Sequence, residues 1–234
     1  MTEIALVADL HGNLPAVEAL DQDLTRRGIK NIWCLGDLVG KGPSSAETMD
    51  WAMDRCSVIL RGNWDEGIGR KQFPRDEFYY GQLGDQRLKQ LRNLPLEHYC
   101  WCSGHHIRLM HGRPLLPRAL QVHGDEELFR PFFSPDFDVV GYADVHRQGT
   151  RIINDAGFLF NVGSVGNGLG QPLVQYAIMR GDLFSHTLAP FDLSMVTLPY
   201  NRTQALRDTD AAEKMGLVNA EAFRQELRTG RYAR

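Results

Sequence analysis

The sequence of 234 residues lacks several features that define particular classes of protein. No apolar run approaches the roughly 18 residues of a membrane-spanning helix. Lys and Arg number 26 against 29 Asp and Glu, giving a formal net charge of −3, so no basic surplus indicates bulk nucleic-acid binding. The start, Met1 to Glu3, lacks the basic region of a secretory signal. The four cysteines lie mainly in apolar contexts, so we expect reduced thiols and a cytoplasmic protein.

The composition is that of an ordinary globular protein. Hydrophobic residues make up 43% and charged residues 24%, so disorder is not expected. We find no internal repeat and no low-complexity run. The prediction is a single domain over residues 1–234, with a core over about 3–190 and a charged, peripheral helical tail over about 203–234.

Three short apolar runs alternate with two helical patterns in the first 65 residues. The runs read as strands at 4–8, 31–35 and 57–61, and the helical patterns lie over 14–28 and 45–55. This βαβαβ order predicts a parallel sheet with helical crossovers.

Further strands are predicted along the rest of the chain. Residues 66–95 read as helices and loops across the mouth of a site, and an acidic helix is expected to start near Asp125. The expected strands are 99–102, 107–110, 138–142, 150–154, 158–162 and 175–180, with 184–188 as the partner of the last.

Polar side chains follow five of these strands at the point where each strand ends. Because the carboxyl ends of parallel strands share one edge of a sheet, these side chains can converge. Each alone has an ordinary explanation as a cap or a core residue, but the repetition predicts a shared site. The residues are Asp9 and His11, Asp37, Asn63, His111, and Asp144 and His146.

The types of these residues indicate divalent metal ions. Asp9 and His11 are two apart on a segment expected to be extended, which places both on one side, within reach of one cation. Carboxylates, imidazoles and an amide without thiolates favour Mn, Fe, Zn or Mg-type ions over soft metals. Seven ligands exceed the needs of one tetrahedral ion and suit two ions that share a carboxylate, about 3.5–4 Å apart.

At these residues the chain resembles the calcineurin-like metallophosphoesterase superfamily. That family carries D-x-H, G-D-x-x-G, G-N-H-[DE], a strand-end His and G-H-x-H. The matching segments here are Asp9-Leu10-His11, Gly36-Asp37-Leu38-Val39-Gly40, Gly62-Asn63-Trp64-Asp65, His111-Gly112 and Ala143-Asp144-Val145-His146. A later turn, Asn161 to Gly166, resembles the YfcE-like branch of small bacterial phosphoesterases. The resemblance covers roughly residues 3–180.

The resemblance implies a fold, a cofactor and an activity. The fold would be α/β, a two-sheet β-sandwich core flanked by helices, so the parallel start would be one sheet of two. Two divalent ions are implied, Mn first, with Fe, Zn, Ni or Mg as alternatives. A hydroxide bridging them would hydrolyse a phosphomonoester or phosphodiester of a phosphorylated small molecule, nucleotides included.

The resemblance also implies residue roles. The first metal would be held by Asp9, His11 and His146, with Asp37 bridging to the second. The second metal would take Asn63 and His111, with Asp144 as a further ligand. Asp37 and Asn63 would act in catalysis, and Asn63 would also contact the substrate.

Asp144 departs from the family pattern, which has a histidine there. Its carboxylate can still coordinate a metal through oxygen, but the added negative charge favours a harder ion and weakens the attraction for phosphate. A different alignment, starting the motif at Gly141, puts Tyr142 and Asp144 at the histidine positions. We prefer the alignment that retains His146.

Trp64 is the second departure, since the family has a histidine beside the asparagine. That histidine resembles a general acid that protonates the leaving oxygen, and an indole cannot deliver a proton. Its loss would cost about 10²–10⁴-fold for a poor leaving group and less for a phosphoanhydride or an aryl ester. Asp65 and His123 are candidates to compensate, so Asp65 is included among the catalytic residues.

Three arginines are candidates for phosphate contact. Arg113 is preferred because it follows a predicted ligand, and Arg147, beside His146, is similar. Arg61 reads equally well as a surface charge. Separately, Cys100-Trp101-Cys102 with His105-His106 could form a zinc cluster, but strand alternation puts both cysteines on one face, where packing is the better interpretation.

A rival to the enzyme hypothesis belongs to a different class. The departures at Trp64 and Asp144 would also suit a non-catalytic or regulatory metal-binding protein of the same fold, because one fold hosts many functions.

Overall fold

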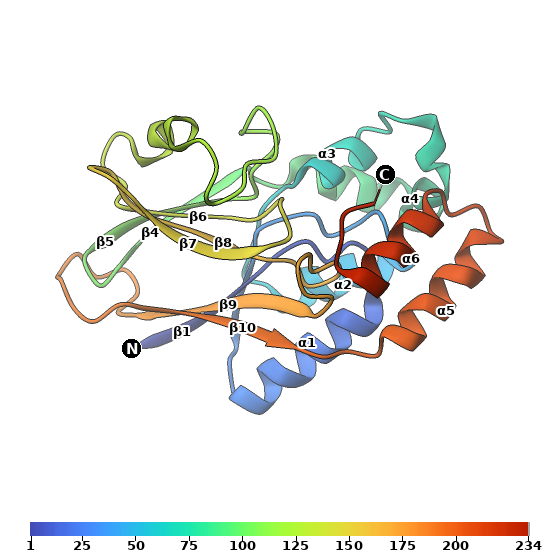
Figure 1. Ribbon diagram of the computed structural model, residues 1–234, viewed down its shortest axis with the longest axis horizontal. Coiled ribbons are helices and arrows are strands. Elements are labelled where there is room, and N and C mark those ends of the chain that lie inside the picture. Colours follow the sequence, from blue (N-terminus) through green and yellow to red (C-terminus); the bar gives the residue numbers. More distant parts are fainter. Residues whose placement is uncertain (234) are drawn as a thin grey trace.

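The computed structural model describes residues 1–233, and its core is two five-stranded sheets that face each other, with helices outside them (Figure 1). The first sheet has the order β10-β9-β1-β2-β3, with β1, β2 and β3 parallel. Its strands are β1 (Thr2–Val7), β2 (Asn31–Cys34), β3 (Val58–Ile59), β9 (Val174–Gly181) and β10 (Asp192–Leu198).

The second sheet has the order β4-β5-β6-β8-β7. Its centre, β5-β6-β8, is parallel, and its two edge pairs are antiparallel. The strands are β4 (Glu97–Cys102), β5 (His105–Met110), β6 (Val139–Tyr142), β7 (Gln148–Ile153) and β8 (Gly157–Val162). The two-sheet α/β fold implied by the family resemblance is therefore confirmed.

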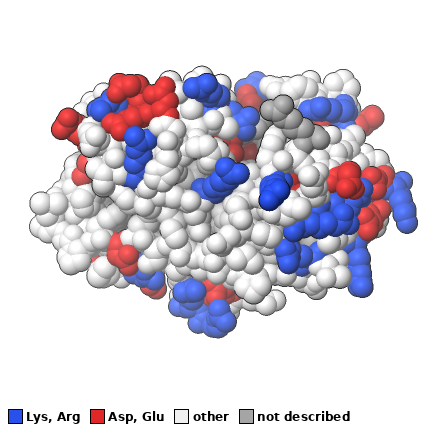
Figure 2. Space-filling model, viewed as in Figure 1, with Lys and Arg blue, Asp and Glu red and all other residues white. Residues whose placement is uncertain are grey.

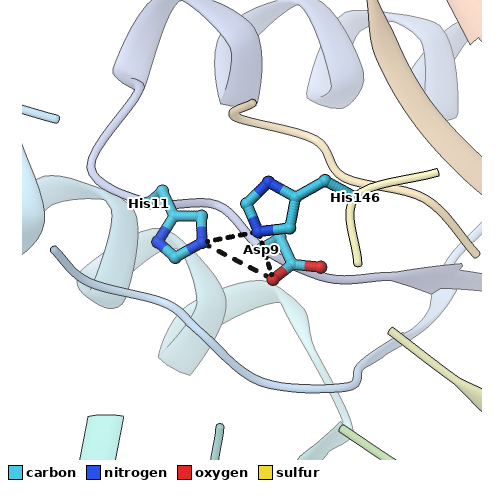
Figure 3. A group of neighbouring side chains, drawn as sticks. All are labelled: Asp9, His11 and His146. Atoms are coloured by element: carbon cyan, nitrogen blue, oxygen red, sulfur yellow. Dashed lines mark hydrogen bonds and ion pairs between the residues drawn. The ribbon is translucent and has the colours of Figure 1, made fainter. Parts of the chain in front are cut away.

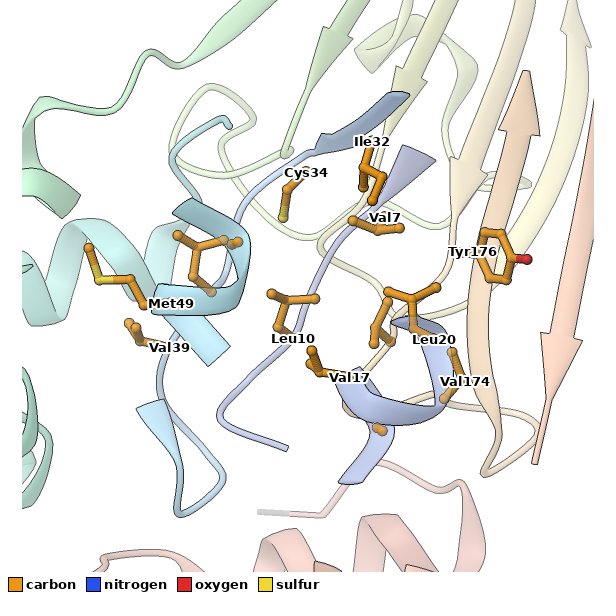
Figure 4. Close-up of a cluster of buried hydrophobic side chains, with 14 of the residues drawn as sticks. Val7, Leu10, Val17, Leu20, Ile32, Cys34, Val39, Met49, Val174 and Tyr176 are labelled. Carbon is orange, nitrogen blue, oxygen red and sulfur yellow. The ribbon is translucent and has the colours of Figure 1, made fainter. Parts of the chain in front are cut away.

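Strand β1 is buried on both faces, as its continuous apolar run predicts. Ile4 and Leu6 pack between the two sheets against residues such as Leu109 and Phe160. Ala5 and Val7 point the other way, into the layer of helices. Figure 4 shows this second cluster. It includes Val7 at the end of β1 and Leu10 after it, Val17 and Leu20 from α1, and Val174 and Tyr176 from β9.

The helices cover the first sheet and one end of the sandwich (Figure 1). Three short 3-10 turns, at 74–76, 126–128 and 130–133, accompany them, so the expected acidic helix near Asp125 is a pair of short turns. The helices are α1 (Leu14–Arg27), α2 (Ser45–Arg55), α3 (Asn63–Gly69), α4 (Glu77–Asn93), α5 (Arg202–Glu213) and α6 (Ala220–Thr229). No helix in the described part of the chain is both long and apolar enough to cross a membrane.

Two strand predictions need correction. The expected partner of β9 at 184–188 is wrong, because β9 pairs with β10 and β1 instead. Phe184 and Leu188 lie in a loop and are 71% and 79% exposed. The third strand is also shorter than expected, at two residues.

The C-terminal tail is helical, as predicted, but it is not peripheral. Charged side chains of both signs gather over α5 and α6 on the face shown in Figure 2, which suits an outer surface. The inner faces of these helices bury Ala212, Phe223 and Leu227, together with the carboxylate of Glu226. The tail therefore forms part of the folded core and reaches the site described next.

Candidate metal centre

The loops after β1 and β6 bring together three predicted ligands, Asp9, His11 and His146 (Figure 3). The two imidazole Nε2 atoms are 3.1 Å apart. Asp9 Oδ1 lies 3.5 Å from Nε2 of His11 and 3.2 Å from Nε2 of His146. All three residues are buried, so their ligand atoms face one shared point away from solvent.

A second group forms beside the first from Asp9, Asp37 and His111. Nε2 of His111 is 3.3 Å from Asp37 Oδ2 and 3.9 Å from Asp9 Oδ1. Asp37 Oδ2 is also 3.6 Å from Nε2 of His11. Both carboxylates therefore touch both groups, and either can bridge two ions.

The backbone conformation that delivers these ligands is uncommon. Residues other than glycine rarely adopt positive φ, and such positions concentrate at functional sites. Asp9 and His11 are thus on turns rather than on an extended segment, and their convergence comes from these turns instead of strand alternation. The ligands with positive φ are Asp9 (55°), His11 (46°), Asp37 (56°), Asp144 (71°) and His146 (56°).

Each candidate histidine is held by a backbone carbonyl. His11 Nδ1 is 3.2 Å from the carbonyl of Val39, and His111 Nδ1 is 2.8 Å from that of Leu35. The third, His146 Nδ1, is 2.9 Å from the carbonyl of Asn167. Because a carbonyl can only accept, Nδ1 carries a proton in each ring, and the neutral form of the ring presents its Nε2 lone pair to a metal. Burial alone would lower the pKa of His111, but Asp37 and Asp9 outweigh burial and raise that pKa to about 10, so a metal would displace a proton from this ring.

Several buried ligand atoms have no hydrogen-bond partner among the described residues. Both carboxylate oxygens of Asp9, Oδ1 of Asn63 and Nε2 of His111 are in this state. Leaving such groups unpaired costs about 1–3 kcal/mol each. The Nε2 lone pairs of His11 and His146 also face one another. The donor set therefore fits divalent cations, which would satisfy these atoms at once.

The charges of the site also suit a cation. Burial alone would raise the pKa of Asp9, but His146 and His11 outweigh burial and hold that pKa below its ordinary value. In the same way, His111 and His11 lower the pKa of Asp37. Burial lowers the pKa of His11. Ionised carboxylates and a neutral imidazole are the forms that bind metals.

Asp65 supports the backbone of the site rather than lining it. Its Oδ2 accepts from the amides of Asp37 (2.8 Å) and Gly62 (2.9 Å), and its Oδ1 accepts from the amide of Leu38 (2.9 Å). The side chain is fully buried. This placement argues against our expectation that Asp65 protonates a leaving group.

Gly62 explains why the asparagine motif begins with glycine. A Cβ at this position would lie 2.1 Å from Oδ1 of Asp37. That oxygen also accepts from the amide of Trp64 at 2.8 Å. The glycine therefore lets the loop after β3 close onto Asp37.

Asp144 lies at the edge of the second group and is paired with Arg113. The guanidinium Nη2 is 2.6 Å from Oδ1 and Nε is 2.9 Å from Oδ2. Oδ1 of Asp144 is 4.0 Å from Nε2 of His111. Tyr142 instead points into an apolar cluster and donates to the carbonyl of Leu120, which agrees with the alignment that keeps His146 as a ligand.

A cavity of about 580 Å³ opens onto these residues, within the range of small-molecule sites. Asp37, Asn63, Asp144 and His146 lie in its wall. So do Arg113 and Arg147, the two preferred phosphate candidates, and Trp64. The Trp64 ring meets the imidazole of His11 edge to face, with centroids 5.7 Å apart.

The remaining candidates lie elsewhere. Arg61 pairs with Glu66, and His123 is exposed and does not line the cavity. Cys100 and Cys102 are buried, free and packed between the sheets. Within residues 1–233, the two groups above are the only ones that gather three metal-binding side chains, so packing is the role of these cysteines.

The sequence analysis missed part of the cavity wall. Lys41, Phe73, Arg75 and Tyr232 also line it. None of the four lies in a recognisable motif, and Tyr232 comes from the tail that was expected to be peripheral. The positive φ of Lys41 (55°) was not predictable from the sequence, because a lysine in a loop does not require this conformation.

Comparison with known proteins finds relatives in sequence and in fold. The uncharacterized protein MJ0912 of Methanocaldococcus jannaschii is 28% identical over 184 residues, covering 70% of this chain and 76% of that protein. Among solved structures, a metallophosphoesterase from Sphaerobacter thermophilus has a TM-score of 0.74 at 20% identity, covering 98% of this chain and 99% of its own. YfcE, a phosphoesterase from E. coli, has a TM-score of 0.52 at 20% identity, covering 86% and 100%.

At 20% identity, the similarity to these two solved structures shows a shared fold. A family model described as calcineurin-like phosphoesterase matches residues 2–153, from β1 through β7, and this segment contains every candidate ligand. The chain belongs to the calcineurin-like phosphoesterase family.

Proposed function

We propose that this protein is a metal-dependent phosphoesterase that hydrolyses a phosphomonoester or phosphodiester of a small molecule. The observation that carries the proposal is the set of buried, unpaired ligand atoms on Asp9, Asn63 and His111. Asn63 lines a cavity that has three arginines in its wall. When bound, two divalent ions would lower the pKa of a water molecule and neutralise phosphoryl oxygens, and Mn is the preferred candidate.

The ligand assignment follows the two groups. Asp9, His11 and His146 would hold one ion, and Asp37 and His111 the other, with Asp37 shared. Asn63, whose Oδ1 is buried and unpaired, would complete the second set. Asp144 would join it only by loosening its contact with Arg113.

The chain's own groups would bind and orient the phosphate. Arg113, held in place by Asp144, presents a guanidinium beside the second group, and a guanidinium matches phosphate oxygens in geometry and charge. Trp64 excludes water over His11 but cannot donate a proton to the leaving oxygen. The site therefore suits substrates with good leaving groups, such as phosphoanhydrides and aryl esters.

A second candidate is a non-catalytic metal-binding protein of the same fold. The absence of a proton donor at Trp64 and the pairing of Asp144 with Arg113 favour it. Both hypotheses share the metal centre, and they differ only in turnover.

Hydrolysis of p-nitrophenyl phosphate and bis-p-nitrophenyl phosphate with added Mn separates the two. We expect Mn-dependent turnover of at least one ester, lost in Asp37→Asn. The matched control is Asp85→Asn, because Asp85 is exposed and pairs only with Lys71 at the surface. No Mn-dependent turnover by the wild type would support the non-catalytic protein, and turnover that survives Asp37→Asn would contradict the proposed site.

A further inference from the structure

The cavity wall contains a tyrosine ring paired with a lysine, neither of which the metal centre uses. Lys41 Nζ lies over the ring of Tyr232, 5.5 Å from its centroid. Both residues line the cavity. Tyr232 is 63% exposed, so most of this side chain is available to a ligand.

The pair is held by a buried carboxylate. Glu226 on α6 accepts from Lys41 Nζ at 2.9 Å and from Asn167 Nδ2 at 2.6 Å. Its other oxygen accepts from the amide of Ala233 at 3.0 Å. On the other side of Tyr232, the carbonyl of Gly230 accepts from the amide of Gly170 at 2.8 Å. Hydrogen bonds on both sides therefore fix the segment that carries the ring.

The same contacts connect the pair to the metal ligands. Asn167, which donates to Glu226, also accepts from Nδ1 of His146 through its carbonyl. The turn that carries Lys41 is bound to the loop of His11, because the amide of Gly42 donates to the carbonyl of His11 at 2.9 Å. Hydrogen bonds thus connect the segments that carry the ring and the lysine to the candidate centre.

A tyrosine ring with a cation beside it, close to a candidate phosphate site, is suited to an aromatic base attached to a phosphate. Aromatic side chains stack on nucleobases of any sequence, and cations beside them add attraction. Arg75, Arg113 and Arg147 supply further positive charge in the same cavity. The volume of about 580 Å³ is sufficient for a small organic ligand together with its phosphate.

The ring lies outside the segment that defines the family. The family model ends at residue 153, whereas Tyr232 and Glu226 follow it. The common part of the fold supplies the metal ligands, and the C-terminal part supplies this wall of the cavity.

We infer that the site takes nucleotides, with the phosphate at the metal centre and the base against Tyr232. This substrate class rests on the proposed phosphoesterase function for its phosphate end, while the base end rests on Tyr232 and Lys41 alone.

Binding of two non-hydrolysable phosphonates tests the inference by calorimetry on the full chain with Mn. One is the phosphonate analogue of adenosine 5′-monophosphate, and the other is the matching ribose phosphonate without the base. We expect the adenosine compound to bind at least about tenfold more tightly, because its base can stack on the ring, and tenfold corresponds to about 1.4 kcal/mol. Tyr232→Ala should remove most of this preference, and Tyr232→Phe, which keeps the ring, should retain it.

Tyr99→Ala is the matched control, because Tyr99 is an exposed tyrosine outside the cavity lining. Equal affinity for the two phosphonates would overturn the inference. A base preference that survives Tyr232→Ala but disappears in Phe73→Ala would also overturn it, since Phe73 and Arg75 form another ring and cation pair in the wall.

The Mn-dependent assay on the p-nitrophenyl esters separates this result from the phosphoesterase proposal. A base preference without turnover would contradict the proposed function and leave the nucleotide site standing. Turnover without a base preference would support the proposed function and overturn the nucleotide site.

Discussion

Asp9 carries the strongest constraint of any single residue in the site. Both of its carboxylate oxygens are buried without a hydrogen-bond partner in the described chain, and its backbone has a positive φ. The unpaired oxygens destabilise the folded protein unless a cation satisfies them, and the positive φ adds backbone strain. Metal binding therefore explains the arrangement of Asp9, whereas a contribution to folding stability does not.

Trp64 governs which leaving groups the site can expel. Because its indole cannot act as an acid, the wild-type rate should fall steeply as the pKa of the leaving alcohol rises. We expect Trp64→His to raise turnover of alkyl phosphates by about 10²-fold and that of aryl phosphates much less. The measurement is kcat/KM across a series of esters. An equal change for alkyl and aryl esters would argue against a proton-transfer role for this position.

At the scale of single residues, the sequence predicted which side chains would meet but not how they are held. Strand ends and motif spacing located Asp9, Asp37 and His111. The left-handed backbone at Asp9, His11 and Asp37 was not predictable, because neither Asp nor His requires a positive φ. The ion pair of Asp144 with Arg113 was also hidden, since each residue was interpreted separately, one as a ligand and the other as a phosphate contact.

Among the elements, helix α1 is hydrogen-bonded to the first sheet through the buried carboxylate of Asp23. Asp23 accepts from Tyr176 of β9 at 2.5 Å and from Arg27 at 2.8 Å. Burial by itself would raise the pKa of Asp23, but hydrogen bonds from Tyr176, Arg27 and Arg26 outweigh burial and lower it. The ionised form is thus favoured in the folded state.

We expect Asp23→Asn to lower the free energy of unfolding at pH 7 by about 1–3 kcal/mol, because it weakens charge-assisted hydrogen bonds. A lowered folded-state pKa contributes stability above the ordinary pKa near 4, and this contribution is lost as pH falls below it. The gap between wild type and variant should therefore shrink below about pH 4. Urea unfolding at several pH values measures the gap, and a gap independent of pH would contradict this role.

Elements with a clear apolar pattern, including the amphipathic helices α1 and α2, were predicted well, but the edge strand β10 was missed. The continuous apolar runs at β1 and β2 predict buried strands without an alternative, because both faces of each strand are buried. Phe184 and Leu188 suggested a strand by their apolar character, yet both are exposed in a loop, while the true edge strand β10 has mixed burial. In α6, nothing distinguishes the buried Glu226 from the exposed charges around it in the sequence.

On the scale of the whole molecule, the candidate centre joins the two sheets. Asp9, His11 and Asp37 follow strands of the first sheet, whereas His111 and His146 follow strands of the second. A metal bound here would connect both halves of the sandwich and would bind the native state alone.

Mn should therefore raise the thermal stability of the protein. At 100-fold above its dissociation constant a ligand adds about 2.7 kcal/mol, which for a chain of this size is a Tm increase of about 5–10 °C. Calorimetry with Mn and with EDTA measures the effect. The increase should be absent in Asp9→Asn and present in Asp85→Asn, and an equal increase in all three proteins would mean that Mn acts elsewhere.

The most direct test of the metal centre is anomalous diffraction from crystals grown with Mn. We expect two peaks in each chain. One should lie among Asp9, His11 and His146, and the other between Asp37 and His111. Peaks only at other positions, or no peak at either group, would contradict the assignment of these buried, unpaired atoms as the ligands of a divalent metal pair.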